Sequence, residues 1–497
     1  MILVWLIVIP LVAGLLAWMS GRRSRTWPRW IALAGISGDL LIAIVVWIRA
    51  RGAPPPGAAP WIVDLNARWV DPLGISFHLG LDGLSLLLVL LTAFLGVLSV
   101  AASWTEIQER VGLFHFHLMW VLAGIIGVFL ALDLFLFYFF WEMMLVPMYF
   151  LIGMWGHERR IYAAVKFFIF TQISGLLMLI AIVALYFVHG RATGVYTFDY
   201  VQLVGTRLEP TTAWWLMLGF VGAFAVKLPM VPVHTWLPDA HTEAPTVGSV
   251  VLASLLLKTG AYGLLRFVLP LFHEAAGAFA PVAIVVGVVG VLYGAVLAFG
   301  QTDLKRLVAY TSVSHMGFVL IGVFAGTTLA LHGAILQILC HGISTGALFI
   351  LVGALQERTH TRDTRRLGGL WHVVPRMGGM TMVFALASMG LPGLGNFVAE
   401  FLVLIGTYPV SPGATILASL GLIVSTVYAL WMVQAAFQGR EPEPLRIRDL
   451  GPREMAMAIA LVVAIVWLGI YPQPVIDTAA PVVTSLTTAS PTRSAAR

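Results

Sequence analysis

The sequence predicts an all-α protein that spans a membrane about fourteen times. Of its 497 residues, 60% are hydrophobic and 10% are charged, against roughly a quarter charged residues in an ordinary globular protein. Apolar runs of about 20 residues, the length that crosses the hydrocarbon core, recur along the chain. Most charges lie in short segments between these runs. This composition excludes a water-soluble enzyme, a coiled coil and a disordered chain.

The apolar runs give the expected transmembrane helices in order. Their approximate bounds are 2–19, 30–48, 79–102, 113–132, 134–154, 167–188, 214–233, 247–269, 279–299, 307–325, 329–355, 380–408, 414–436 and 455–471. No basic residue precedes the first run, so we expect it to be retained as a span and not cleaved as a signal peptide.

Five segments follow from this order of helices. We expect an N-terminal three-helix segment at 1–110, a first five-helix repeat at 111–270, a second at 277–437, a C-terminal loop with the last helix at 438–475, and an external tail at 476–497. An odd number of helices per repeat turns the second copy upside down in the membrane. The two repeats are therefore expected to be inverted.

Basic residues in the loops set the expected orientation. Arginine and lysine concentrate on one side, as at 22–29, 159–166 and 358–376, and are fewer in the opposite loops. Because cytoplasmic loops carry this excess, both termini are expected on the outer, periplasmic side. The proline-rich stretch 54–60 then lies in an external loop, and 485–497, rich in Ser, Thr and Ala, is expected to be a disordered external tail.

We single out four of the charged residues that lie inside apolar runs, where each costs on the order of 3 kcal/mol unless paired or hydrated. They are Glu142, Lys227, Lys258 and Glu400. One interpretation is a structural ion pair of Glu142 with Lys227 that joins two helices. The other is a proton relay: a buried lysine holds its proton weakly, a nearby carboxylate strengthens that hold, and withdrawal of the carboxylate releases the proton onward. We favour the relay, because a cost repeated four times indicates a use.

Histidines extend the candidate set, since imidazole titrates near neutral pH and can both donate and accept. His315 and His341 lie in runs that also contain serine and threonine, where they hold either a chain of waters or ordinary buried hydrogen bonds. His234 and His241 fall in an expected cytoplasmic loop, in which Pro238 should interrupt any helix. Their spacing matches no specific metal-ligand pattern. We therefore favour proton entry, or plain loop structure, over a metal site.

Two expected spans contain prolines next to charged residues. Pro229 and Pro232 follow Lys227, and Pro392 precedes Glu400. Proline frees backbone carbonyls, which is tolerated at membrane depth only where protein or water satisfies them. Interrupted helices at equivalent places in two halves indicate an inverted-repeat transporter, so we expect discontinuous helices at spans seven and twelve. The alternative is that these prolines only kink the helices for packing.

Redox chemistry and nucleic-acid binding find little support in the residues. The single cysteine, Cys340, excludes a disulfide framework, a cysteine-ligated zinc site and an iron–sulfur cluster held by this chain alone. No glycine-rich dinucleotide motif follows a strand and opens a helix. The net charge of +6 is spread over short loops and forms no continuous stripe, so no nucleic-acid partner is expected.

Six motifs resemble those of the antiporter-like subunits of respiratory complex I, the NADH:quinone oxidoreductase, and together they cover nearly the whole chain. They are FWEMMLVPMY at 140–149, VKLP at 226–229, HTWLPDAH at 234–241, DLKRL at 303–307, SVSHMG at 312–317 and NFVAEF at 396–401. The chain most resembles the M type, also called the chain-4 type. In the L and N types and in the related Mrp sodium/proton antiporters the equivalent of Glu400 is typically lysine.

The resemblance implies roles for the buried charges. Glu142 and Lys227 would be the proton-input pair, Lys258 the central relay and Glu400 the outlet. His315 and His341 would lie on the connecting hydrated axis, while His234 and His241 remain secondary candidates. No metal or cofactor is expected on this chain.

The resemblance also implies the function and the partners. The chain would be a proton-translocating subunit of a redox-driven complex in the bacterial inner membrane, beside L- and N-type subunits and phospholipids. FMN, iron–sulfur clusters, NADH and quinone would be bound by partner subunits. The alternatives are a subunit of an Mrp-type antiporter, which Glu400 disfavours, the membrane arm of a hydrogenase-type complex, or a passive scaffold with the buried charges as staples.

Overall fold

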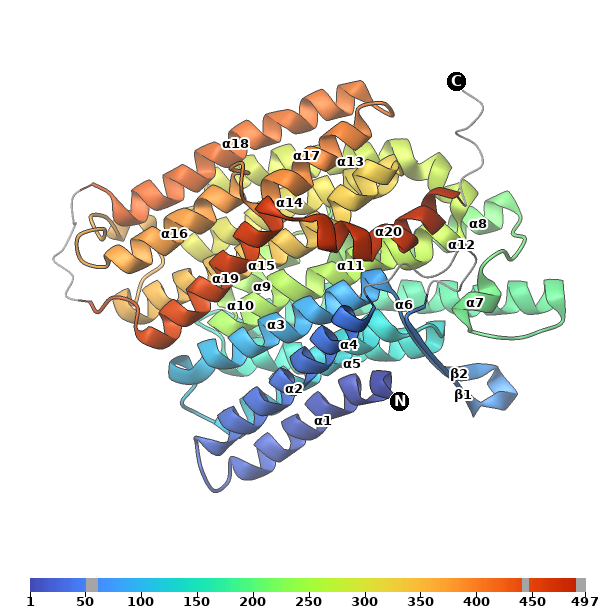
Figure 1. The fold of residues 1–497 in the computed structure, drawn as a ribbon, viewed down its shortest axis with the longest axis horizontal. Helices are drawn as coiled ribbons and strands as arrows, with labels where there is room; N and C mark the ends of the chain where they lie inside the picture. The colour runs from blue at the N-terminus through green and yellow to red at the C-terminus, as the bar shows by residue number, and fades with distance from the viewer. Residues whose placement is uncertain (51–60, 440–446, 489–497) are drawn as a thin grey trace.

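The structure, a computed structural model, describes residues 1–50, 61–439 and 447–488. Long helices run roughly alongside one another, with the helices of residues 2–49 at one side of the bundle and that of residues 412–437 at the other (Figure 1). The last two helices, within residues 452–488, cross between these sides. Twelve helices in this part of the chain are long and apolar enough to cross a membrane. The prediction of a mostly helical, multi-pass membrane protein is confirmed.

The elements are given in chain order. They are α1 (Ile2–Ser20), α2 (Trp27–Arg49), β1 (Val63–Val70), η1 (Asp71–Leu73), β2 (Ile75–Leu81), α3 (Gly83–Glu106), α4 (Val111–Leu130), α5 (Leu134–Trp155), α6 (Arg160–Thr193), α7 (Tyr200–Leu203), α8 (Pro210–Lys227), α9 (Trp236–Glu243), α10 (Thr246–Val251), η2 (Leu252–Leu256), α11 (Leu257–Gly263), η3 (Leu264–Val268), α12 (Leu269–Leu271), α13 (His273–Phe299), α14 (Leu304–Ala325), α15 (Thr328–Thr359), η4 (Thr364–Arg366), α16 (Pro375–Ser388), α17 (Gly395–Thr407), α18 (Pro412–Phe437), α19 (Pro452–Ile470) and α20 (Gln473–Thr488).

A β-hairpin between α2 and α3 makes the chain mostly helical, whereas an entirely helical chain was expected. Strands β1 and β2 pair antiparallel, with Val63 opposite Leu81. Gly74 closes the turn at φ 65°, a conformation that favours glycine. The alternation of polar and apolar residues before and after Asp71 is the signal that sequence reasoning missed. Because β2 takes residues expected in the third span, that helix begins at Gly83.

Aspartates begin three of the long helices. Asp82 precedes α3, Asp133 precedes α5 and Asp303 precedes α14, and each carboxylate accepts hydrogen bonds from backbone N–H groups of the first turn. These groups have no partner within the helix, so the aspartates satisfy donors that would otherwise be unpaired. The caps set where each helix begins and so fix the register of the side chains further along.

Two expected spans are broken at the places where prolines lie. Helix α8 ends at Lys227 and α9 begins at Trp236, while α16 ends at Ser388 and α17 begins at Gly395. Neither α8 nor the α16–α17 pair is among the twelve helices long and apolar enough to cross alone. Both breaks place a helix end, Lys227 of α8 and Ser388 of α16, among buried residues.

The C-terminal part differs from the expectation. Residues 485–488 belong to the amphipathic helix α20, so the disorder expected from residue 485 is wrong for them. The remainder of that expected tail, 489–497, and the expected loop at 54–60 lie outside the described residues.

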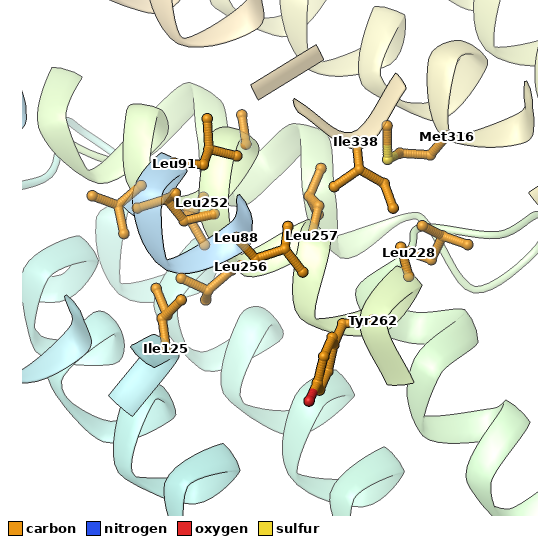
Figure 2. Close-up of a cluster of buried hydrophobic side chains, with 14 of the residues drawn as sticks. Leu88, Leu91, Ile125, Leu228, Leu252, Leu256, Leu257, Tyr262, Met316 and Ile338 are labelled. Atoms are coloured by element: carbon orange, nitrogen blue, oxygen red, sulfur yellow. The ribbon is translucent and has the colours of Figure 1, made fainter. Parts of the chain in front are cut away.

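A layer of apolar side chains fills the middle of the bundle, where the two halves meet (Figure 2). It includes Leu88 of α3, Ile125 of α4, Leu256 of η2, Met316 of α14 and Ile338 of α15, all at most 1% exposed. The polar groups beside this layer lie in a medium of low dielectric, in which charges interact strongly.

Candidate functional site

The break after α8 places Lys227 in the protein interior. Lys227 is the last residue of α8 and is 0% exposed. Its Nζ has no hydrogen-bond partner among the described residues. It lies 5.3 Å from the ring centroid of Trp141 and 5.5 Å from that of Phe167. Contact with aromatic faces is favourable for an ammonium group out of water, and it leaves the donors of the lysine free for a changing partner.

Glu142 approaches the same region from α5 but does not bind Lys227 directly. Its Oε1 is buried without a hydrogen-bond partner, although Glu142 lies within electrostatic range of Lys227. The carboxyl group points at Gly175 of α6, where an added Cβ would lie 2.7 Å from Oε1. The two groups predicted as a pair are neighbours, but they do not form the closed ion pair of the structural alternative.

Lys258 lies on a short α-helical segment between two π-helical ones. The chain is π-helical in η2 and η3, and Lys258 is in α11 between them. π-helical segments are rare in proteins and are often found at functional sites. The Nζ of Lys258 forms a hydrogen bond of 2.5 Å with Nδ1 of His341 and lies 3.9 Å from Sδ of Met316. A Cβ added at Gly260 would lie 3.0 Å from Cβ of Lys227, so the end of α8 packs against this segment.

A row of polar contacts continues from His341 to Glu400. The rings of His341 and His315 have centroids 5.6 Å apart. Nδ1 of His315 is 2.8 Å from Oε1 of Glu400. All three side chains are at most 1% exposed. Lys258, His341, His315 and Glu400 therefore form a continuous buried row that joins η2–η3 to the second helix break.

Sequence reasoning missed three residues that bind the far end of this row. Nε2 of Gln337 donates to Oε1 of Glu400 at 2.7 Å. Ser388 Oγ and Tyr428 Oη lie 3.0 and 3.2 Å from Nε2 of His315. Of the three, only Gln337 could have been found from the sequence, because it is a single amide side chain inside the apolar run 329–355. Nothing in the sequence separates Ser388 and Tyr428 from other polar residues in spans.

The structure corrects the placement of His241. It was expected in a loop, but it lies in α9 and is 0% exposed, with both ring nitrogens unpartnered among the described residues. Pro238 does not prevent this helix, because it lies in the first turn, where no backbone N–H is needed. His234 does lie between the helices, and its ring contacts those of Tyr293 and Tyr310.

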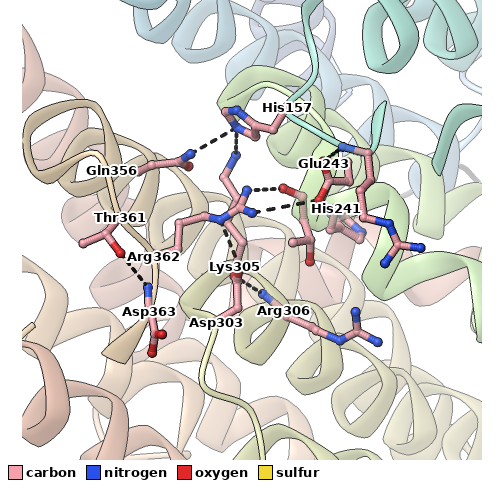
Figure 3. Close-up of polar contacts among 12 residues, drawn as sticks. His157, His241, Glu243, Asp303, Lys305, Arg306, Gln356, Thr361, Arg362 and Asp363 are labelled. Atoms are coloured by element: carbon pink, nitrogen blue, oxygen red, sulfur yellow. Dashed lines mark hydrogen bonds and ion pairs between the residues drawn. The ribbon is translucent and has the colours of Figure 1, made fainter. Parts of the chain in front are cut away.

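A second polar cluster, the Lys305 cluster, surrounds a lysine that was expected in a loop. It comprises His157, Glu243, Asp303, Lys305, Gln356 and Arg362 (Figure 3). Lys305 is 0% exposed, and its Nζ donates to the carbonyl of Ala244 at 3.0 Å and to Nε2 of His157 at 3.3 Å. Burial, with Lys305 and Arg362 nearby, lowers the pKa of His157 to about 3, so its ring is neutral and accepts.

Arg266, near the end of the expected span 247–269, is also buried. Its guanidinium forms an ion pair with Asp82, the cap of α3, and both residues are at most 6% exposed. Basic residues at the ends of apolar runs therefore were not reliable markers of loops. Within the described ranges no group of three or more His, Cys, Asp or Glu is placed to hold a metal.

Residues 131–426 match the family model described as the NADH:quinone oxidoreductase/Mrp antiporter transmembrane family. NADH-quinone oxidoreductase subunit M of Pseudomonas aeruginosa is 56% identical over 491 residues, 97% of this chain and 96% of that protein. The chain belongs to the subunit M family. The subunit M of Escherichia coli K12 is 52% identical, over 96% of each chain.

Solved structures of related membrane complexes have the same fold as this chain. A chain of respiratory complex I from Thermus thermophilus superposes with a TM-score of 0.89 at 30% identity, covering 99% of this chain and 100% of that one. A chain of the Mrp complex from a Dietzia species reaches 0.86 at 21% identity, over 98% and 97%. At 21% identity, the similarity to the Mrp chain shows only that the two chains share a fold.

Proposed function

We propose that this chain is a proton-translocating subunit in the membrane arm of NADH-quinone oxidoreductase, respiratory complex I. Electrons pass from NADH to quinone on partner subunits, and this chain moves protons across the membrane in response. The observation that carries the proposal is the buried row of Lys258, His341, His315 and Glu400. Every neighbouring pair in it is joined by a hydrogen bond or a ring contact.

The side chains divide the transfer into steps. Glu142 sets the proton affinity of Lys227, because approach of its carboxylate stabilises the ammonium and withdrawal destabilises it. Lys227 then passes its proton to Lys258, whose segment packs against the end of α8. His341 and His315 carry it to Glu400, and His234 and His241 serve the entry side. Moving one charge costs about 2.3 kcal/mol per 100 mV, so the drive must come from outside the row.

The finer architecture belongs to the same proposal. The twelve long helices, with the broken pairs α8–α9 and α16–α17, make fourteen crossings. Helices α4 to α12 and α13 to α18 are two inverted repeats, with Lys227 and Glu400 at equivalent breaks. Both termini lie on the periplasmic side of the bacterial inner membrane.

The partners follow from the complex. L- and N-type antiporter-like subunits flank this chain, and phospholipids contact its exposed apolar faces, such as Ile180 of α6, Val285 of α13 and Ile423 of α18. We further propose that FMN, iron–sulfur clusters, NADH and quinone are bound by other subunits of the complex.

Proton uptake by inverted membrane vesicles, driven by NADH, tests the proposal. The Lys227→Ala variant should assemble into the complex but lose proton uptake together with coupled NADH oxidation. Normal uptake by the assembled variant would mean that Lys227 is a structural residue and not a relay. If NADH drives no uptake even by the wild type, an antiporter or a hydrogenase-type complex is the better assignment.

A further inference from the structure

A surface pocket, the α1–α4 pocket, lies where the end of α1 meets the beginning of α4. Its volume is about 560 Å³, within the range of small-molecule binding pockets. Its lining includes three arginines, Arg22, Arg25 and Arg110, and a single acidic residue, Glu109. Positive charge therefore prevails in the pocket, and an anion is the ligand that it favours.

The arginines of the pocket have few partners in the protein. The guanidinium of Arg22 lies 5.9 Å from the ring centroid of Trp18. Among the described residues, none forms an ion pair with Arg22, Arg25 or Arg110. Arg25 is also within electrostatic range of another cation, Arg29. The donors of these side chains are thus available to a ligand, and guanidinium groups bind phosphate oxygens well.

Contacts within the protein hold the walls of the pocket in place. Nη2 of Arg29 donates to the carbonyl of Ile107 at 2.9 Å and to Oε1 of Gln108 at 3.3 Å, which fastens the linker between α3 and α4 to the beginning of α2. A Cβ added at Gly21 would lie 2.8 Å from Cα of Gly112, so the two helix ends pack closely. This packing brings the arginines of two separate segments into one pocket.

The first turn of α4 adds backbone donors to the same pocket. Val111, Gly112 and Leu113 line it, and in the described part of the chain no group accepts from their backbone N–H groups. Arg110, which precedes the helix, provides no side-chain cap. Free N–H groups and the helix dipole favour an anion at this end of a helix. They point the same way as the three guanidinium groups.

An exposed apolar surface of α1 continues from the pocket along the helix. Trp18, in the pocket lining, is 43% exposed, and Leu15, one turn away on the same side, is 39% exposed. Val12 and Leu16 are 45% and 48% exposed. A soluble anion would gain nothing from this surface. A lipid matches both parts, because its phosphate fits the arginines and its acyl chains can cover the apolar side chains.

We propose that the α1–α4 pocket binds the phosphate group of an anionic phospholipid, whose acyl chains lie along the exposed surface of α1. The inference rests on the membrane setting in the proposed function and adds the class of lipid and its site. In the proposed orientation this end of α1 is cytoplasmic, and anionic lipids give the cytoplasmic leaflet its negative surface potential. A zwitterionic lipid fits less well, because its ammonium group would lie beside the arginines.

Photolabelling of the purified complex in lipid nanodiscs tests the proposal. The probe is phosphatidylglycerol with a diazirine near the carbonyl end of one acyl chain, diluted in phosphatidylcholine. Mass spectrometry after pepsin digestion locates the labelled residues. Segments 15–25 and 107–113, which contain the pocket, should be labelled. The matched phosphatidylcholine probe, whose headgroup has no net charge, should label them far less.

Arginine variants measure the contribution of charge. Each basic residue near an anionic lipid is worth about fivefold in binding, so Arg22→Gln should lower the labelling by about fivefold, and the double variant Arg22→Gln/Arg25→Gln by about 25-fold. Both side chains are exposed, so the variants should assemble. Arg23→Gln is the matched control, because it removes the same charge from the same loop but does not line the pocket. The control should be labelled like wild type.

Four results would overturn the lipid site. Equal labelling by the two probes would show that headgroup charge is not recognised, and equal labelling of wild type and the double variant would show that the arginines do not bind the lipid. Absence of labelling by either probe would show that the pocket is covered in the complex. Loss of labelling when phosphate replaces chloride at equal ionic strength would make soluble phosphate the ligand.

The labelling outcome is separate from that of the proposed proton relay. The experiment is done without NADH, so it does not depend on proton transfer. The Lys227→Ala variant should be labelled like wild type even though its proton uptake is lost. Unlabelled complex that still takes up protons would overturn the lipid site alone, whereas normal labelling of an assembled Lys227→Ala complex with normal proton uptake would overturn the relay alone.

Discussion

A methyl group added at Gly175 would displace the carboxyl group of Glu142. The new carbon would lie 2.7 Å from Oε1, while Trp141 Nε1 at 3.6 Å has room. An unstrained carbon–oxygen contact needs about 3.4 Å, so the carboxyl group must move by about 0.7 Å. It is the end of a flexible side chain, and the shift costs about 0.5–1.5 kcal/mol of rotamer strain. The Gly175→Ala variant should therefore fold and assemble.

Proton transfer depends more steeply on position than folding does. Misplacement of a reacting group by about 1 Å can cost about 10²-fold in rate, so a 0.7 Å shift of Glu142 should reduce proton uptake per NADH oxidised by about tenfold. The assay is the initial rate of uptake by inverted vesicles. Gly153→Ala in α5, whose nearest atom would be 3.6 Å away, is the matched control and should behave as wild type.

A double variant shows whether the effect acts through Glu142. Glu142→Asp shortens the side chain and removes the oxygen from the new methyl group, so the two changes together should cost less than the sum of each alone. Strictly additive losses, or wild-type uptake in Gly175→Ala, would refute the idea that Gly175 positions the carboxyl group.

Two predictions concern stability, one at the hairpin and one at a buried ion pair. Burial lowers the pKa of His78, but hydrogen bonds and charge attraction from Asp199 and Asp64 outweigh it, so the pKa is raised overall. The stabilisation is thus complete below about pH 6.5, the ordinary histidine value, and is lost as the pH rises through the folded value. Amide hydrogen exchange in β1 and β2, corrected for intrinsic rates, should show more opening at alkaline pH, and a flat profile would contradict this. Asp82→Asn should destabilise the protein by about 3–5 kcal/mol, because it leaves the Arg266 guanidinium buried without its counter-ion. Thermal unfolding of the assembled complex would measure this loss of stability. An unchanged unfolding midpoint would contradict the prediction.

The sequence located the breaks and the charges next to them because both are local. Prolines beside charged residues marked both breaks, the one after Lys227 and the one before Glu400. Proline alone does not, because Pro10, Pro147 and Pro281 lie inside the unbroken helices α1, α5 and α13. The row from Lys258 to Glu400 also joins residues that were selected beforehand. Its roles remain predictions, since the contacts alone do not measure proton transfer.

Long-range packing could not be predicted in the same way. Lys305 and Arg266 border apolar runs, as loop residues do, and only their partners from distant helices show that they are buried. Gly175 carries no chemical signal, yet it leaves the space that a polar group of another helix occupies. The hairpin was missed for a different reason, because its apolar residues continued into the next helix and were counted with it.

The close contact between His315 and His341 limits how many charges the row can hold. With ring centroids 5.6 Å apart, two imidazolium ions would repel each other by about 3 kcal/mol at an effective dielectric constant of about 20. That is about two orders of magnitude in occupancy. In the proposed relay, a second proton would therefore enter the row only after the first has moved on to Glu400. The protons would pass along the row one at a time.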